Sequence, residues 1–176
     1  MNSNERNKTM LTLTRTAVLL SLALIFQVGF NQFAQPAVGP LVNMTLIIAA
    51  IVVGPISAVI IGCLTPLVAF FLGIMPLLPV VPFIMIANTL LVLTFSLFKG
   101  KFHKFGAWIG VVLAAVVKAS FLAISIRYLV VLFVEKVPPK LIAAFSLPQL
   151  YTALIGGVLA VIIAHYLSGY LKNQEK

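Results

Sequence analysis

The sequence predicts an all-α integral membrane protein, a single bundle of six transmembrane helices with both termini in the cytoplasm. Of its 176 residues 62% are hydrophobic and 9% are charged, whereas about a quarter of a soluble domain is charged. No Asp, Glu, Lys, Arg or His occurs from Thr16 to Phe98. A helix crosses a hydrocarbon core with about 20 apolar residues, so this stretch alone has room for three or four spans.

Proline, glycine and charged residues divide the apolar mass into six segments. The first ends in a polar stretch before Pro36, and the second starts after Gly39 and Pro40. At about 14 residues the second is short for a full crossing unless the residues before Pro40 join it. Pro66 predicts a kink in the third, and a proline-rich stretch separates it from the fourth. The expected spans are 10–30, 41–54, 56–72, 80–98, 106–134 and 147–171, in one membrane domain (10–171) between cytoplasmic tails 1–9 and 172–176.

The positions of the cations test this count of spans. The net charge is +9, which in a soluble protein would suggest nucleic acid. With six spans, eight Lys and Arg residues fall on the cytoplasmic side and two on the outer side, as the positive-inside rule requires. Five spans would move Lys172 and Lys176 outside and weaken this bias. The inner set is Arg6, Lys8, Arg15, Lys99, Lys101, Lys104, Lys172 and Lys176, and the outer set is Lys136 and Lys140.

The polar residues of the spans gather in their outer half. Counting 1.5 Å per residue places Asn88 about 12 Å below the outer surface, and Lys118 at nearly the same depth. Asn43 falls at the outer start of the second span. Gln149 and Thr152 fall at the outer start of the sixth. The asymmetry predicts a site that opens to the outside.

Each polar group has a second interpretation. Asn88 could simply bond a neighbouring helix, as amides commonly do in membranes. Lys118 is harder to explain by structure alone, because a cation at this depth is costly and usually faces an interior or a cavity; snorkelling is the alternative. Arg127 could touch a ligand or extend to lipid headgroups. Two cations without a carboxylate inside any span favour a ligand with a carboxylate, a phosphate or several acceptors.

Several chemistries find no support in the sequence. There is no phosphate-binding G-x-x-x-x-G-K-[ST] loop, so we do not expect this chain to hydrolyse ATP in that way. No cluster of Cys and His predicts a metal site, and no nucleophile–base pair predicts an enzyme. Intramembrane acids are missing, which disfavours proton coupling but leaves sodium open. We therefore expect no cofactor in this chain, no nucleic-acid partner and no catalytic residue.

Five stretches resemble the substrate-binding S component of energy-coupling factor (ECF) vitamin transporters. They are AVLLSLA (17–23), GPLVN (39–43), GPISAVIIG (54–62), PLLPVVP (76–82) and PQLYTALIGG (148–157). The resemblance covers nearly the whole chain. In this family an Ala-x-x-x-Ala face of the first helix contacts the coupling subunit. Here Ala17 matches and Ser21 replaces the second alanine, with Ala23 beside them; generic small-residue packing is the alternative.

The resemblance implies a mechanism and a site. An S component binds a vitamin or precursor from outside, topples in the bacterial cell membrane and releases it inside. A transmembrane coupling subunit and two cytoplasmic ATPases, which consume the ATP, drive this step. The implied pocket residues are Asn88, Lys118, Gln149, Arg127, Asn43, Gln32 and Thr152. The alternatives are a membrane assembly protein, in which polar groups only join helices, and a stand-alone secondary carrier.

Overall fold

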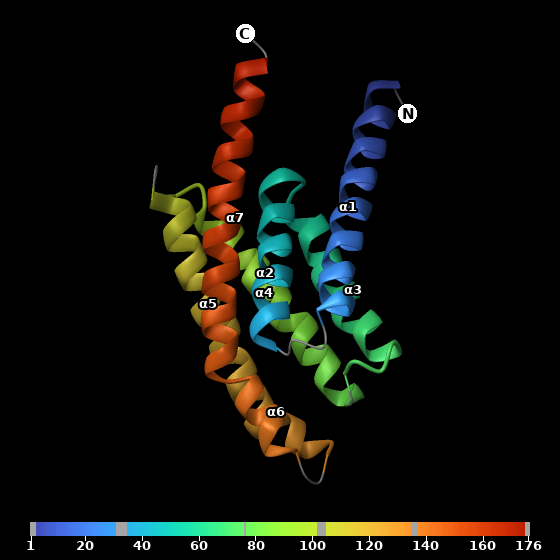
Figure 1. The fold of residues 1–176 in the computed structure, drawn as a ribbon, viewed down its shortest axis with the longest axis vertical. Coiled ribbons are helices and arrows are strands. Elements are labelled where there is room, and N and C mark those ends of the chain that lie inside the picture. The colour runs from blue at the N-terminus through green and yellow to red at the C-terminus, as the bar shows by residue number, and fades with distance from the viewer. Residues whose placement is uncertain (1–2, 31–34, 76, 102–104, 135–136, 175–176) are drawn as a thin grey trace.

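The computed structural model describes residues 3–30, 35–75, 77–101, 105–134 and 137–174. These residues form helices and turns, with no strand among them (Figure 1). Four helical segments are long and apolar enough to cross a membrane, and α2 and α3 are shorter apolar helices. The prediction of an all-α chain with apolar helices long enough to cross a membrane is thereby confirmed. The α-helices are α1 Ser3–Gly29, α2 Gln35–Val52, α3 Pro55–Phe71, α4 Val81–Phe98, α5 Gly106–Ile124, α6 Pro139–Ala144 and α7 Leu147–Gln174.

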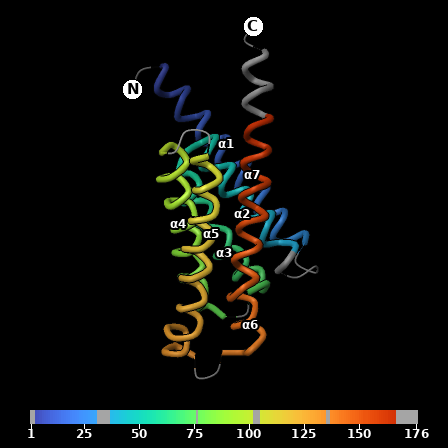
Figure 2. Tube along the Cα trace, turned by 90° about the vertical axis from the view of Figure 1, so that its left-hand side faces the viewer, coloured from blue at the N-terminus to red at the C-terminus, as the bar shows by residue number. Residues whose placement is uncertain are grey.

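The long helices alternate in direction along the bundle. The start of α1 and the end of α7 lie at the same end of the molecule, while α6 lies at the opposite end (Figures 1 and 2). The turn between α2 and α3 lies at the end shared by the two termini (Figure 1). We call this the terminal end of the bundle, and the end with α6 the α6 end.

Helix α2 begins at Gln35, earlier than the expected start at 41. The residues before Pro40 therefore do join it, and the helix reaches 18 residues. Pro40 lies inside the helix, where its missing N–H removes one backbone hydrogen bond. The helix is followed by Gly54, whose φ of 130° is a conformation that favours glycine, and Pro55 then opens α3.

The fifth span differs from the expected continuous helix over 106–134. Regular α-helix ends at Ile124, and a π-helical turn Ser125–Leu129 and a 3₁₀ turn Val130–Leu132 follow. A π turn adds a residue to the helical repeat and so rotates every side chain after it. The short helix α6, which begins with Pro139 after Pro138, has no counterpart in the expected spans.

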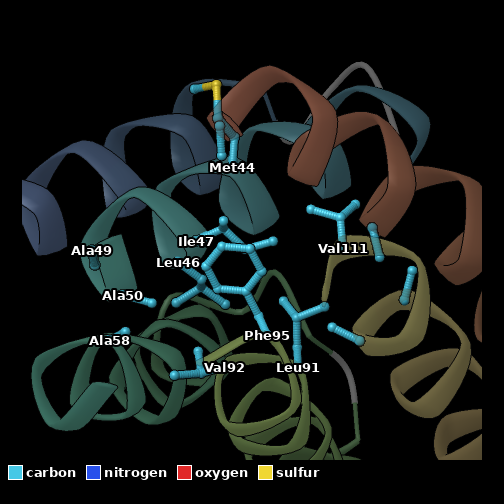
Figure 3. Packing of buried hydrophobic residues seen from close by; sticks show 14 of the residues in the cluster. Met44, Leu46, Ile47, Ala49, Ala50, Ala58, Leu91, Val92, Phe95 and Val111 are labelled. Carbon is cyan, nitrogen blue, oxygen red and sulfur yellow. The ribbon is translucent and has the colours of Figure 1, made fainter. Parts of the chain in front are cut away.

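The core at the terminal end is built from large side chains fitted against small ones. The ring of Phe95 lies near the centre, with Leu46 and Ile47 of α2 beside it and Leu91 of its own helix next to it (Figure 3). All four are fully buried, and Val111 of α5 packs in the same cluster. Alanines let neighbouring helices come close, as is usual in membrane bundles; they are Ala49, Ala50, Ala58, Ala114, Ala115, Ala153 and Ala160.

Helix α1 stands at the edge of the bundle. Ala23 is its single buried residue among those described. Its other side chains are largely exposed, including the apolar Met10, Leu13, Val18 and Ile25. The helix therefore presents an apolar face that the described part of the chain does not cover.

Candidate functional site

A lysine buried between four helices forms the centre of the polar part of the bundle. Lys118 of α5 is 4% exposed. Its Nζ donates to Oδ1 of Asn43 in α2 at 2.6 Å and to Oδ1 of Asn88 in α4 at 2.7 Å. Nδ2 of Asn88 in turn donates to the backbone oxygen of Gly62 in α3 at 2.8 Å. One hydrogen-bonded chain therefore joins α2, α3, α4 and α5.

Two glycines allow this network to form. A Cβ atom on Gly62 would lie 3.0 Å from Cβ of Asn88. A Cβ atom on Gly156 of α7 would lie 2.9 Å from Cβ of Asn43 and 2.4 Å from the backbone oxygen of Pro40. Each amide that accepts a hydrogen bond from Lys118 therefore packs its Cβ atom against a glycine of another helix.

A cavity of about 70 Å³ lies beside Lys118. This is well below the roughly 300–1,000 Å³ of pockets that hold drug-sized ligands. Its polar lining comes from Gln27, Asn43, Thr65, Asn88, Lys118 and Gln149. Its apolar lining comes from Val38, Val42, Pro66, Met75, Ile84 and Phe145, with Gly39 between them.

The start of α7 contributes one residue to the cavity and one to helix packing. Gln149 lines the cavity, is buried, and its Nε2 lies 3.5 Å from the backbone oxygen of Ala144. Thr152 is fully buried and its Oγ1 donates to the backbone oxygen of Gln149 at 3.3 Å. A Cβ atom on Gly39 would lie 2.8 Å from Cβ of Thr152, so Thr152 fills the contact between α7 and α2 rather than the cavity.

Arg127 does not join this site. Its side chain is exposed, and its Nη2 lies 3.5 Å from Oγ of Ser146. It belongs to the π turn after α5 and is not among the residues that line the cavity. Of the cations that the structure describes, Lys118 is therefore the one that lines the cavity. Gln32 lies outside the described residues.

Several lining residues are missing from the set that the sequence predicts. Gln27 and Thr65 add polar groups, and Met75 and Phe145 add apolar cover from the segments at the α6 end. Thr65 stands directly before Pro66, the predicted kink, and a polar residue at a kink inside an apolar helix is a signal that could have singled it out. Met75 and Phe145 lie in connecting segments whose positions depend on tertiary packing, so periodicity gives no signal for them.

The small-residue face of α1 is divided by the structure. Ala17 and Ser21 are exposed on the outside of the bundle. Ala23, which the resemblance groups with them, is fully buried among the core residues. Ala23 therefore does not lie on the exposed face on which Ala17 and Ser21 stand.

Comparison with protein families gives one match. The family model described as ECF transporter, substrate-specific component, matches residues 11–168. Comparison with curated proteins and with solved structures gives no match. Among the described residues no three His, Cys, Asp or Glu side chains lie close enough together to hold a metal ion.

Proposed function

Because the chain belongs to the family of ECF transporter substrate-specific components, we propose that it captures a vitamin or a related small precursor outside the cell for import. As a member of this family it is a membrane component of a transport system rather than an enzyme. A small group of the ligand is taken up in the cavity beside Lys118, because its volume of about 70 Å³ is too small for a whole vitamin. Asn43, Asn88 and Gln149 contribute polar contacts there, and Val38, Val42 and Ile84 contribute apolar ones.

One observation carries this proposal, the burial of Lys118 with no carboxylate partner in the described part of the chain. On insertion scales a lysine near the middle of a membrane costs about 2.5–3.5 kcal/mol. Joining helices alone would be achieved by the amides of Asn43 and Asn88 without this cost. The cavity beside Nζ supplies the reason for keeping the charge, since a ligand bound there uses it.

The same proposal includes six membrane crossings with both termini in the cytoplasm. Helices α2 and α3 have 18 and 17 residues, which at 1.5 Å per residue approach the thickness of a hydrocarbon core of about 30 Å. Arg6, Lys8, Lys99 and Lys101 occur at the terminal end of their helices, whereas Lys140 belongs to α6. By the positive-inside rule the terminal end is cytoplasmic and the cavity faces the outside of a bacterial cell membrane.

Energy for uptake comes, in this proposal, from partner proteins. The chain has no phosphate-binding loop motif, so ATP is hydrolysed by two cytoplasmic ATPases and not by this subunit. The uncovered face of α1, with Ala17 and Ser21 among exposed apolar side chains, is where a coupling subunit would pack. Toppling of the bundle against that subunit then moves the bound ligand to the cytoplasmic side.

The test is uptake in a reconstituted system. The chain is co-expressed with an ECF coupling subunit and its two ATPases, purified and placed in vesicles, and small molecules retained by the protein are identified by native mass spectrometry. We expect a stable complex and uptake that requires ATP. Uptake by the chain alone, driven by an ion gradient, would establish a secondary carrier, and the absence of both complex and retained molecule would support an assembly protein.

A further inference from the structure

The cavity beside Lys118 carries the chemistry of an anion site, and this inference rests on the proposed function while naming the class of its ligand. We infer that the ligand has one oxyanion group, a carboxylate or a phosphate, which binds Nζ of Lys118 and the side-chain amide of Asn43. A hydroxyl or N–H group of the same ligand binds Gln27.

The first step is the hydrogen-bond count at Lys118. An ammonium group has three N–H donors and no acceptor. Two of them bind Oδ1 of Asn43 and Oδ1 of Asn88, at 2.6 and 2.7 Å, distances typical of charge-assisted bonds. The third has no acceptor among the described residues. A donor of a buried, charged group that meets no acceptor is costly, and the cavity is the place from which an acceptor can reach it.

The second step is the charge balance around the cavity. Among the described residues no Asp or Glu lines it, and neither acceptor of Lys118 is charged. Arg127 lies outside it. The described lining therefore carries one positive charge, which a ligand with a single negative charge neutralises inside a medium where an unpaired charge is strongly disfavoured.

The third step separates the two amides. Nδ2 of Asn88 uses one of its two N–H donors on the backbone oxygen of Gly62, and Oδ1 of the same amide accepts from Lys118. Nδ2 of Asn43 has no partner among the described residues, while Oδ1 of the same amide holds Lys118. Asn43 therefore places a second donor next to the free N–H of Lys118. Two adjacent donors, one of them charged, match the paired oxygens of a carboxylate or phosphate.

The fourth step concerns the acceptor left at the cavity. Oε1 of Gln27 is buried and makes no hydrogen bond among the described residues. Gln27 also lines the cavity. Leaving a buried amide oxygen without a donor is unfavourable, and a ligand hydroxyl or N–H would satisfy it. The complete site thus fits a compact acid that carries a separate hydrogen-bond donor.

A first experiment measures thermal unfolding of the purified full-length chain with acetate, with the matched neutral probe acetamide, and with inorganic phosphate, all at equal ionic strength set with chloride. Acetate is expected to raise the unfolding temperature by about 2–4 °C, and acetamide to have no effect. The shift of the unfolding temperature with phosphate is compared with the shift with acetate, and the larger of the two shows whether the site prefers a phosphate or a carboxylate. Equal effects of acetate and acetamide would overturn the inference, and they are the result expected if Lys118 were a neutral amine with both N–H groups already used.

Matched variants locate the effect. Lys118→Met keeps the length of the side chain and should abolish the acetate shift, while Lys101→Met, at an exposed lysine far from the cavity, should keep it. Because each shift is measured against the same variant without acetate, a change in basal stability does not obscure it. A shift that persists in Lys118→Met assigns the anion to another place and refutes the site.

A second experiment separates this inference from the proposed function. Molecules retained by the parent chain and by Lys118→Met are extracted and identified by mass spectrometry, with at least a tenfold loss expected for the variant. ATP-driven uptake of a neutral or cationic compound would leave the function standing and overturn the anion site. An acetate shift that depends on Lys118, in a chain that forms no transport complex, would support the anion site and overturn the proposed function.

Discussion

Two sets of buried residues lie on the same faces of the same helices, at two levels of the bundle that are two helical turns apart. We call them the polar level (Asn43, Asn88 and Lys118) and the apolar level (Ala50, Phe95 and Val111). Each member of one level lies seven residues from a member of the other on α2, α4 or α5. Seven residues make nearly two full turns and about 10.5 Å of helix, so each pair shares a face, and all six residues are buried.

This comparison shows that side-chain chemistry, and not helix geometry, distinguishes the site from the core. Lipid tails are as apolar as leucine, so the apolar level gains stability mainly from close packing. At the polar level every group needs a partner, since a buried polar group left without one costs about 1–3 kcal/mol, and a charged group more. The apolar level should therefore tolerate a change of volume better than the polar level tolerates loss of a partner.

The largest effect is expected from Gly156→Ala of α7, because Gly156 packs against α2 at the polar residue Asn43. Its new Cβ would lie 2.4 Å from the backbone oxygen of Pro40 and 2.9 Å from Cβ of Asn43, and backbone cannot move as a side chain can. We expect a loss of about 3 kcal/mol in the free energy of unfolding in mixed micelles, together with a weaker acetate shift. Gly29→Ala is the matched control, because nothing lies within 4 Å of the Cβ it would add. Equal stability of the two variants would show that α2 and α7 are not in close contact here.

The next effect is expected at the polar level alone. Asn88→Ala leaves Lys118 with one acceptor and the oxygen of Gly62 without its donor, and should cost about 2.5 kcal/mol, as for hydrogen bonds to charged groups. In a double variant, Lys118→Met removes the charge and Asn88→Leu fills the space of the amide. We expect this variant to recover part of the lost stability, since the oxygens of Gly62 and Asn43 still lack their donors, and to lose retained ligand and uptake. A double variant as unstable as Asn88→Ala would mean that the charge is not what makes the polar level sensitive.

At the apolar level, Phe95→Ala is expected to cost about 2 kcal/mol, the cavity part of a large-to-small change, because lipid offers no gain on transfer from water. The acetate shift should stay at the parent value, since Phe95 does not line the cavity. Both are read from thermal unfolding with and without acetate. A lost acetate shift would show that the two levels are coupled and contradict the comparison.

Much of this division could be predicted from the sequence, because hydropathy and depth depend on counting along a chain of known rise. The count of 1.5 Å per residue places Asn88 and Lys118 at one depth. In the structure Nζ of Lys118 lies 2.7 Å from Oδ1 of Asn88. Counting does not give the rotation of a helix about its own axis. Asn43, expected at the outer start of the second span, therefore proves to be the second acceptor of Lys118.

Other features depend on contacts that no local pattern records. The close approach of Gly156 to α2 and of Gly62 to Asn88 involves residues far apart in the sequence. The π turn at Ser125 rotates the side chains beyond it, so a straight-helix count could not give the direction of Arg127. Met75 and Phe145 reach the cavity from segments without helical periodicity.

The smallest effect is expected at Lys99, which follows the last residue of α4 and joins the terminal ends of two helices. Its Nζ donates to the backbone oxygen of Ala50 at 2.6 Å, and Lys99→Met should cost about 0.5–1 kcal/mol at neutral pH.

Burial lowers the pKa of Lys99 from its ordinary value of 10.5. Between the lowered pKa and 10.5 the unfolded chain binds more protons than the folded chain, so this group adds stability as pH rises through that window. The difference in unfolding free energy between the parent and Lys99→Met should therefore grow from neutral pH toward 10.5, with other titrations cancelling between the two. A difference that shrinks over this range would show that the folded chain favours the ammonium form of Lys99. Lys99 would then resemble Lys118, whose side chain is held by polar partners.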